Sequence, residues 1–442
     1  MGRYRRLLPF IAGLAIVASP ASVAATSHAG SLPATAALDW NMITVSTVRG
    51  ATVPLPKFQI EGLIYVSYAQ AAVYDAVTKI EGRYVPYHRF KVGRKVNVRH
   101  ASPDAAIAAA SYYTLRHYLG DQPQAFLDTL DATYLAYVAA LSNRGKKSGL
   151  AVGRAAAHDI IELREHDGLN GPYTFTPGPA DPGAWQFAPP PSLQFAQTPW
   201  VGKMHPFLLK RASQFRSPRP PALTSQAWAD AFNEVKDYGA VNSAVRTPDQ
   251  TAVAYFWNAN TIHQYNLAFR DLATAHGFDL VDTVRLLAMG NMVASDSGIG
   301  CMASKYRIAF WRPITAIRDA ASDGNPLTVA DPTWSPLLTT PNHPEDPSAH
   351  GCVTGAVAEV FRAVLGTKWI GVDIHGSATG APGDFTAVRH YNSVKDLTDE
   401  ITNARTWIGF HYRFSTVAGV KLGRQAADWA LARYFRPVKS DH

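Results

Sequence analysis

Three separated segments of the sequence carry the residue types that bind and transform a tetrahedral oxyanion. In chain order these residues are Lys305, Arg312, Ser348, Ala349, His350, Arg405 and His411. Lysine and arginine supply fixed positive charge, serine and backbone amides supply neutral donors, and histidine changes its protonation near neutral pH. The set predicts a site for phosphate or vanadate, where one histidine bonds the central atom and the other handles protons.

The middle segment, HPEDPSAHGC at residues 343–352, precedes the apolar run VTGAVAEVFRAVL. Prolines followed by good helix formers are typical of a helix N-terminus, so we expect a helix to start near Ser348. The first amides of a helix have no partner within it, and the macrodipole is positive there, which suits an anion. Taken alone, the segment indicates a capped helix first and an anion site second.

The other two segments constrain how their side chains can meet. Lys305 and Arg312 are seven residues apart, which on one continuous helix places them on the same face, and the proline after Arg312 should kink that helix. Alone, such a pair is more typical of a solvated helix surface. Arg405 and His411 are six residues apart, so they converge only if the helix loosens near Gly409 or the arginine reaches around.

The elements expected to position these residues are helices. Apolar residues at three-and-four spacing predict helices at 58–82, 103–120, 123–145, 149–168, 251–277, 280–294, 302–320, 348–365, 394–409 and 416–435. Ser102 should cap the second of these, and Thr247 with Gln250 forms a capping box before the fifth. Apart from a short hairpin within residues 373–392, no strand pattern stands out. The predicted fold is therefore all-α, with two four-helix-bundle-like halves packed into one globular unit.

Composition divides the chain into four parts. Residues 1–25 combine three arginines, a short apolar core and small residues, which predicts a signal peptide and an exported, periplasmic or secreted protein. Residues 26–170 are an N-terminal helical region, and residues 225–442 a C-terminal bundle that carries the oxyanion site. Between them, residues 171–224 are too rich in proline for regular helix, yet their aromatic residues favour an ordered connection against the core.

The bulk charge excludes some partners. The chain has 442 residues, of which 47% are hydrophobic and 17% charged, so it is a globular protein rather than a disordered one. Without the three arginines of the leader, the formal charge falls from +8 to +5. No dense basic run interleaves with aromatic residues, so we expect no nucleic-acid partner. No segment after the leader is apolar enough to span a membrane, and the oligomeric state is not encoded in any pattern.

In this order and with these gaps, K-x6-R-P, P-S-x-H and R-x5-H resemble the motif shared by vanadium-dependent haloperoxidases and type 2 phosphatidic acid phosphatases, the superfamily of bacterial acid phosphatases. The resemblance extends through residues 69–87, 232–258 and 305–318, and looks closest to the soluble, exported, bacterial haloperoxidase-like branch. It implies a vanadate cofactor and the oxidation of halide by hydrogen peroxide to hypohalous acid.

The same resemblance implies a role for each site residue. The equatorial oxygens of vanadate would be held by Lys305, Arg312, Ser348, the amide of Ala349 and Arg405. His411 would be the ligand to the metal, and His350 the acid-base residue beside the opposite apical oxygen. Catalysis would thus rest on the two histidines.

Three positions depart from the family pattern. Ala349 stands where P-S-G-H has glycine, and Ala404 stands where a serine is usual. Ser415 replaces the aspartate that usually follows the last histidine by four residues, and it could instead cap the final helix. In the phosphatases that aspartate is thought to orient the nucleophilic histidine, so its loss counts modestly against phosphatase chemistry.

Two further functions stay open at this point. The same pocket filled with phosphate would give an acid phosphatase that hydrolyses phosphomonoesters, with His411 attacking phosphorus and His350 protonating the leaving group. A catalytically silent helical protein that binds an oxyanion or a partner is the third hypothesis. His263 and His343 are more typical of structural residues, although either could border the pocket. Zinc-ligand spacing is lacking among the fifteen histidines, which disfavours a zinc site.

The remaining reactive and aromatic residues have simpler interpretations. Phe310 and Trp311 are expected in the core rather than in contact with halide. Cys301 and Cys352 are the only cysteines, and export would permit a disulfide between them. If the oxyanion site assembles, the two cysteines lie near each other, which favours that disulfide, subject to bond geometry.

Overall fold

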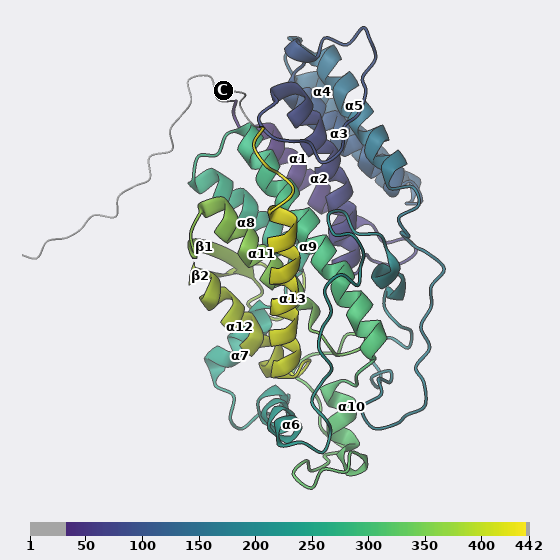
Figure 1. The fold of residues 1–442 in the computed structure, drawn as a ribbon, viewed down its shortest axis with the longest axis vertical. Helices are drawn as coiled ribbons and strands as arrows, with labels where there is room; N and C mark the ends of the chain where they lie inside the picture. The colour runs from purple at the N-terminus through teal and green to yellow at the C-terminus, as the bar shows by residue number, and fades with distance from the viewer. Residues whose placement is uncertain (1–31, 439–442) are drawn as a thin grey trace, which may run out of the picture.

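The computed structural model describes residues 32–438, and the expected signal peptide lies outside them. Within this part of the chain the fold is helical, as predicted, with one two-stranded hairpin (Figure 1). The α-helices are α1 Thr35–Gly50, α2 Gln59–Glu81, α3 Pro103–Tyr118, α4 Gln124–Ala140, α5 Lys146–Leu163, α6 Gln226–Gly239, α7 Pro248–Phe256, α8 Thr261–Ala275, α9 Leu280–Ile308, α10 Pro313–Arg318, α11 Ala349–Leu365, α12 Val394–Trp407 and α13 Arg413–Leu431. Short 3-10 helices are η1 Val98–His100, η2 Pro199–Lys203 and η3 Ala320–Ser322. The all-α fold class is confirmed.

The first five helices form a bundle at one end of the molecule (Figure 1). Small residues let α3 and α5 approach closely, because a Cβ on Gly153 would lie 2.2 Å from the carbonyl oxygen of Ala106. The predicted cap at Ser102 is confirmed, since its side chain accepts a hydrogen bond from the amide of Ala105. Helix α2 is buried along almost its whole length and ends at Gly82, which has a φ of +69°. Helix α1 was not predicted.

A second set of helices surrounds the site, with α9 at its centre. This 29-residue helix is buried on most sides and joins the two halves, because Ser295 in α9 lies 2.8 Å from Ser67 in α2, oxygen to oxygen. Helices α11 and α13 touch through their backbones. A Cβ on Gly423 would lie 2.0 Å from the carbonyl oxygen of Cys352. This glycine contact fixes where α11 begins, and therefore where Ser348 and its neighbours lie.

Two helix predictions were wrong in their boundaries. Residues 251–277 do not form one helix, because α7 ends within this range and the side chain of Asn260 caps the start of α8. Conversely, the helix expected at 280–294 continues to Ile308 as α9, and the helix expected at 302–320 is divided between α9 and α10 by Ala309, which is in the left-handed conformation. Polar caps and tertiary burial set the helix boundaries in both regions. The periodicity of apolar residues does not encode these boundaries.

The proline-rich segment 171–224 contains no α-helix and lies against the core. Its residues Phe207, Leu208 and Leu209 donate their backbone amides to the carboxylate of Asp296 in α9, at 2.6 to 2.7 Å. Phe207 and Leu208 are also buried within the main hydrophobic cluster. The division of the chain into four parts remains a prediction, since the helices of both halves share this one cluster.

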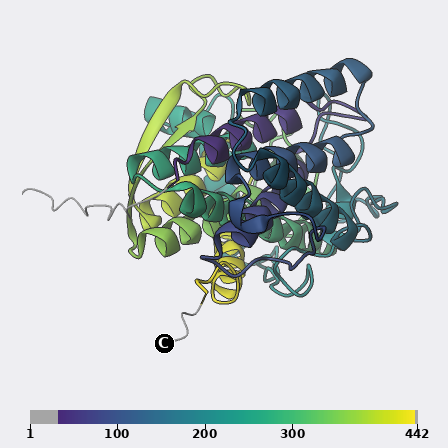
Figure 2. The same ribbon diagram turned by 90° about the horizontal axis from the view of Figure 1, so that it is seen from above.

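The predicted hairpin is present. Strands β1 Trp369–Gly376 and β2 Ala387–Ser393 pair antiparallel, with Val372 opposite Tyr391. The hairpin lies at the edge of the molecule, on the side away from α3, α4 and α5 (Figure 2). No helix within residues 32–438 is both long and apolar enough to cross a membrane.

Candidate active site

The N-terminus of α11 carries the middle segment of the predicted site. Ser348 is the N-cap, and its hydroxyl accepts a hydrogen bond from the amide of Gly351 at 3.4 Å. Ala349 is the first helical residue, so its Cβ replaces the expected glycine without strain. The position of Ser348 is fixed from behind by α13, because its amide donates to the carbonyl of Ser415 at 3.1 Å. The helix start therefore presents its free amides to whatever lies in front of it.

Lys305 and Arg312 do not share a helix, contrary to the prediction. Lys305 lies at the end of α9, whereas Arg312 is the N-cap of the separate helix α10. Both side chains nevertheless reach the loop before α11. The Lys305 ammonium donates to the carbonyls of Pro344 and Glu345, each at 2.9 Å, and the Arg312 Nε donates to the carbonyl of His343 at 2.9 Å. Because the helix ends between these two residues, their side chains approach the same loop from different directions.

The loosening expected near Gly409 is confirmed. Helix α12 ends at Trp407, and Gly409 has a φ of +80° with its Cα packed against the backbone of Gly239. The chain then folds back so that the amide of His411 donates to the carbonyl of Arg405 at 3.2 Å. A helix that continued would have placed these two side chains about 120° apart.

A hydrogen-bond chain fixes the state of His411. The Arg312 Nη1 donates to the carbonyl of Phe410 at 2.9 Å and lies 3.2 Å from the Nε2 of His411. Since a guanidinium group only donates, this Nε2 carries a lone pair and the proton sits on Nδ1. That Nδ1 lies 2.8 Å from Oε1 of Glu345. Burial lowers the pKa of His411 well below its usual value, and the charge of Arg312 acts in the same direction, so the ring is neutral.

Glu345 is the functional residue that sequence reasoning missed. Its side chain is fully buried, and Oε1 also accepts the backbone amide of Tyr412 at 3.1 Å. Burial raises the pKa of Glu345 to about 8, assisted by the charge of Asp346. The family pattern directs attention to position 415, where the structure shows the Ser415 hydroxyl donating to the Glu345 carbonyl at 3.4 Å rather than capping α13. An acid three residues before Ser348 is the signal that could have revealed it.

Arg405 completes the group of cations. It is 1% exposed, donates Nη1 to the carbonyl of Trp257 at 3.2 Å, and leaves its buried Nε without a partner. Burial lowers its pKa to about 9, and the nearby Arg312 adds to this. Burial likewise lowers the pKa of Lys305 to about 8. Within residues 32–438 no carboxylate lies within ion-pair distance of any of these three cations, so none of the three has a direct ion-pair partner there.

His350 faces the same space. Its Nε2 is buried and has no hydrogen-bond partner. Burial lowers its pKa well below the usual value and the charge of Arg405 adds to the effect, so His350 is neutral and ready to accept a proton. A cavity of about 60 Å³ lies between these groups, lined by His343, Ala349, His350, Val353, Arg405 and His411 among others. This is about twice the volume that one water molecule occupies in the liquid, which suits a small oxyanion.

The other residues considered from sequence lie where structural roles would place them. His263 contacts Arg49 and the ring of Phe385, away from the cavity. His343, in contrast, both supports Arg312 at 2.9 Å and lines the cavity. The aromatic residues Phe310 and Trp311 belong to a buried hydrophobic cluster, as predicted. The two cysteines, Cys301 and Cys352, are buried free thiols, so the structure does not contain the disulfide that the sequence favours.

Comparison with known proteins agrees with the site. Residues 285–440 match the family model described as the VCPO second helical-bundle domain. The chain is also similar to the vanadium chloroperoxidase of Curvularia inaequalis, with 28% identity over 295 residues. That match takes in 52% of this chain and 48% of the relative, so the chain spans about half the length of the curated protein it matches.

Solved structures share the fold. The structure described as the first bacterial vanadium-dependent iodoperoxidase superposes with a TM-score of 0.76 and 21% identity, covering 92% of this chain and 98% of that one. The holo form of a bacterial vanadium-dependent chloroperoxidase gives a TM-score of 0.66 and 18% identity, covering 87% and 91%. These matches agree with the motif: residues 285–440 resemble the VCPO second helical-bundle domain, and the fold resembles that of bacterial vanadium-dependent haloperoxidases.

Proposed function

We propose that the protein is a vanadate-dependent haloperoxidase that oxidises halide with hydrogen peroxide to hypohalous acid. One observation carries the proposal: Lys305, Arg312 and Arg405 are buried near one another and form no ion pair among the described residues, and Arg405 lines a small cavity together with His350 and His411. Burying a charge without a partner costs several kcal/mol, on the order of 3 to 5 when a pair is broken. A site that retains three such charges is built for an anion that compensates them.

The donors present fit vanadate. The oxygens would be held by Lys305, Arg312, Ser348, the amide of Ala349 and Arg405. The Nε2 lone pair of His411 is oriented for bonding to the metal because Glu345 holds the Nδ1 proton. The buried, unpartnered Nε2 of His350 offers a second polar contact. When bound, vanadate supplies a Lewis-acid centre that activates hydrogen peroxide for attack by halide.

The side chains of this protein then manage charge and protons. Each turnover consumes one halide, one hydrogen peroxide and one proton, and yields one hypohalous acid and one water. That proton must reach a site formed by buried side chains, and His350 is neutral, buried and free at Nε2 to relay it. The cations lower the energy of negative charge on the oxygens throughout.

A second candidate is phosphomonoester hydrolysis in the same site. The observation that favours it is the pair of His411 and Glu345, because a carboxylate at Nδ1 leaves Nε2 as a nucleophile. The serine at position 415 weighed against this chemistry, and Glu345 removes much of that objection. His350 would then protonate the leaving group. The third candidate, a silent oxyanion-binding or partner-binding protein, required that the motif segments stay apart, and they converge.

Two activity assays on one purified preparation distinguish the peroxidase from the phosphatase. The protein is prepared with and without orthovanadate, then assayed for bromide oxidation with peroxide and for hydrolysis of p-nitrophenyl phosphate. Bromide oxidation that requires vanadate and falls by a factor of about 100 or more in His411→Ala supports the peroxidase. Hydrolysis that vanadate inhibits supports the phosphatase. His276→Ala, which removes an exposed histidine that does not line the cavity, is the matched control and should leave either activity unchanged.

We also propose that the protein is exported. The support is the leader-like composition of residues 1–25, with three arginines before an apolar core and small residues at its end. N-terminal sequencing of the protein from fractionated cells tests this. A mature chain that begins after Ala24 or Ala25 in the exported fraction agrees with the proposal, and an uncut chain in the cytosol contradicts it.

A further inference from the structure

A cavity of about 1020 Å³ lies next to the oxyanion site. Its aromatic lining residues are Phe58, Tyr173, Phe175, Phe187, Phe195 and Trp200, and we call it the aromatic cavity. Its charged lining residues, Lys57 and Glu61, pair with each other at 3.4 Å, so they leave no net charge. Phe195 is 45% exposed, which opens this side of the cavity to solvent.

One shared wall separates the aromatic cavity from the oxyanion site. Phe58 lines both spaces, and its ring centroid lies 5.5 Å from that of His343. The residue before His343 also connects the wall of the oxyanion site to that of the aromatic cavity. Asn342 donates its side-chain amide to the carbonyl of Phe195 at 2.5 Å, and its backbone amide to the side chain of Gln197 at 2.9 Å. A small neutral product formed at the oxyanion site therefore has the aromatic cavity as its immediate neighbour.

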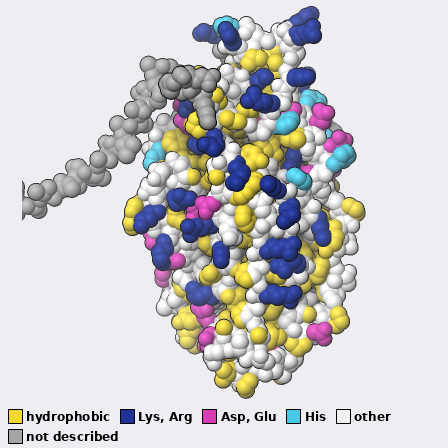
Figure 3. Space-filling model, viewed as in Figure 1, with side chains coloured by type: hydrophobic (Ala, Val, Ile, Leu, Met, Phe, Trp, Pro, Cys, Tyr) yellow, Lys and Arg dark blue, Asp and Glu magenta, His cyan; other side chains and the backbone are white. Residues whose placement is uncertain are grey.

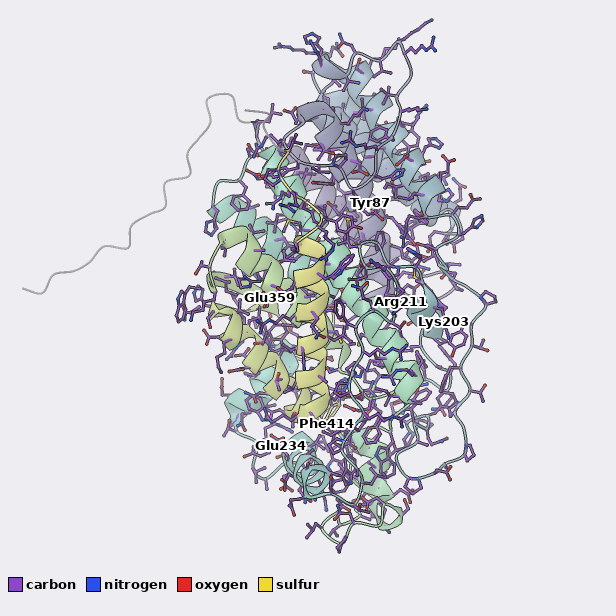
Figure 4. The ribbon with its side chains drawn as sticks, viewed as in Figure 1. Tyr87, Lys203, Arg211, Glu234, Glu359 and Phe414 are labelled. Atoms are coloured by element: carbon purple, nitrogen blue, oxygen red, sulfur yellow. The ribbon has the colours of Figure 1, made fainter. Side chains whose placement is uncertain are left out.

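A basic pocket of about 580 Å³ adjoins the aromatic cavity on another side. Its lining includes Lys203, His205, Arg211 and Arg307, and no aspartate or glutamate. The described residues place no carboxylate within ion-pair distance of these side chains. Figure 4 shows Lys203 and Arg211 near each other beside α9, and Figure 3 shows Lys and Arg side chains at the surface of that region.

The basic pocket and the aromatic cavity share their boundary. Tyr173 and Pro199 line both, and the Lys203 ammonium sits 4.7 Å from the centroid of the Tyr173 ring. Tyr306 of the basic pocket donates its hydroxyl to the carbonyl of Gln197, which lines the aromatic cavity, at 2.6 Å. Positive charge thus lies at one end of an aromatic surface, and the oxyanion site at another.

We propose that the aromatic cavity and the basic pocket together bind an electron-rich aromatic acid, which is halogenated there. The proposal rests on the proposed function, which supplies the hypohalous acid. Charge complementarity selects an anion for Lys203 and Arg211, and the ring-lined cavity selects an aromatic body. In the reaction a ring C–H bond and the oxygen–halogen bond of hypohalous acid break, and a C–halogen bond and an O–H bond of water form. The ring is oxidised, the halogen is reduced, and the proton leaves with hydroxide as water.

Binding is tested with a fluorescent probe of this class. 6-Hydroxy-2-naphthoate is the anionic probe, and 2-naphthol is its neutral counterpart. The double variant Lys203→Gln, Arg211→Gln should weaken the naphthoate Kd by a factor of about 5 to 10, as expected for two partly solvated ion pairs. The Kd of 2-naphthol should change less than about twofold, because the variant leaves the aromatic lining intact. Arg216→Gln removes one positive charge from an exposed position outside the pocket lining and should leave both values unchanged.

Turnover separates this inference from the proposed function. In the vanadate-loaded double variant, bromide oxidation measured without an organic acid should match wild type, whereas bromination of naphthoate should lose the same 5-fold to 10-fold in kcat/KM at subsaturating probe. Equal naphthoate affinity in the double variant and in Arg216→Gln would overturn the inference. Weakened binding with unchanged bromination of naphthoate would also overturn it. A wild-type protein that binds naphthoate but oxidises no halide would sink the proposed function and leave the binding site standing.

Discussion

The Nδ1 of His411 lies 2.8 Å from Oε1 of Glu345, and both side chains are buried. The same histidine presents its other nitrogen to Arg312. One imidazole therefore joins a carboxylate to a cation, and its tautomer is fixed by both partners. This relationship replaces the carboxylate that the family pattern places after the histidine with one that comes 66 residues before it.

Glu345→Gln should lower kcat for halide oxidation by a factor of about 10 to 100 and weaken vanadate binding, because an amide cannot exchange a proton with His411 and orients the Nδ1 proton less strongly than a carboxyl group. Steady-state kinetics and vanadate titration measure the two effects. Asp346→Asn is the matched control, since Asp346 is the adjacent buried acid and bonds Ser217 instead of His411. Equal losses in the two variants would show that Glu345 acts only through folding.

Oxyanion affinity should fall as the pH rises through about 8. Burial lowers the Lys305 pKa to about 8, so the free protein loses this charge at higher pH while a bound dianion favours the charged form. Binding then takes up a proton, and each pH unit above the free pKa costs up to about 1.4 kcal/mol of affinity. Tungstate is the probe, because it stays a dianion from pH 7 to 10. Calorimetry of Lys305→Gln should show a shallower slope than wild type, because Glu345 and Arg405, with pKa values of about 8 and 9, still titrate in this range. An identical slope in that variant would contradict the assignment.

Replacing His350 and replacing His411 should have different effects on vanadate affinity and on kcat. His350→Ala should retain tungstate and vanadate binding within about tenfold, yet lose about 100-fold or more in kcat, as expected for a proton relay. His411→Ala should lose vanadate affinity first, because it removes the proposed ligand. Comparing vanadate Kd with kcat in both variants checks this division. Loss of affinity in His350→Ala with normal turnover at saturation would reverse the roles.

Arg405→Met should leave the ligand-free protein at least as stable as wild type. Arg405 is buried without a counterion, and replacing a buried ion by an apolar side chain of similar length is often neutral or stabilising by about 1 to 4 kcal/mol. The variant should also lose most of the rise in melting temperature that tungstate gives wild type. A lower melting temperature in the absence of anion would contradict the view that this arginine is retained for binding.

Gly409→Ala should destabilise the protein and separate Arg405 from His411. An added Cβ would lie 2.5 Å from the carbonyl of Gly239, and the φ of +80° is unfavourable for alanine. Gly82→Ala is the matched control, because its φ is +69° but its Cβ would meet nothing within 4 Å. The control should cost about 1 kcal/mol and Gly409→Ala at least twice as much in denaturant unfolding. Equal losses of unfolding free energy in the two variants would mean that the contact between Gly409 and Gly239 leaves room for a Cβ.

The sequence predicted the helical fold, whereas it predicted only in part how the candidate site residues are brought together. Ser348 and His350 were placed correctly at a helix start because capping and proline signals are local. Lys305 and Arg312 were expected on one helix, whereas a left-handed Ala309 ends α9 between them. That break is stabilised by tertiary packing, which apolar periodicity does not record.

Glu345 was missed for a different reason. Family resemblance draws attention to positions in the motif, and the carboxylate here comes from outside it. Only the folded chain shows that the loop before α11 turns its glutamate toward His411 instead of solvent. The cavities beside the site also depend on side chains from segments that no sequence pattern connects, such as Phe58 and Gln197.

Titration of the purified protein with orthovanadate tests the central claim most directly, with bromide oxidation as the readout. The account predicts no activity before vanadate is added, a rise that saturates at one vanadate per chain, and competitive loss of activity when phosphate is added. Activity that is present without vanadate, or absent at saturating vanadate while His411 and Glu345 are intact, would contradict it.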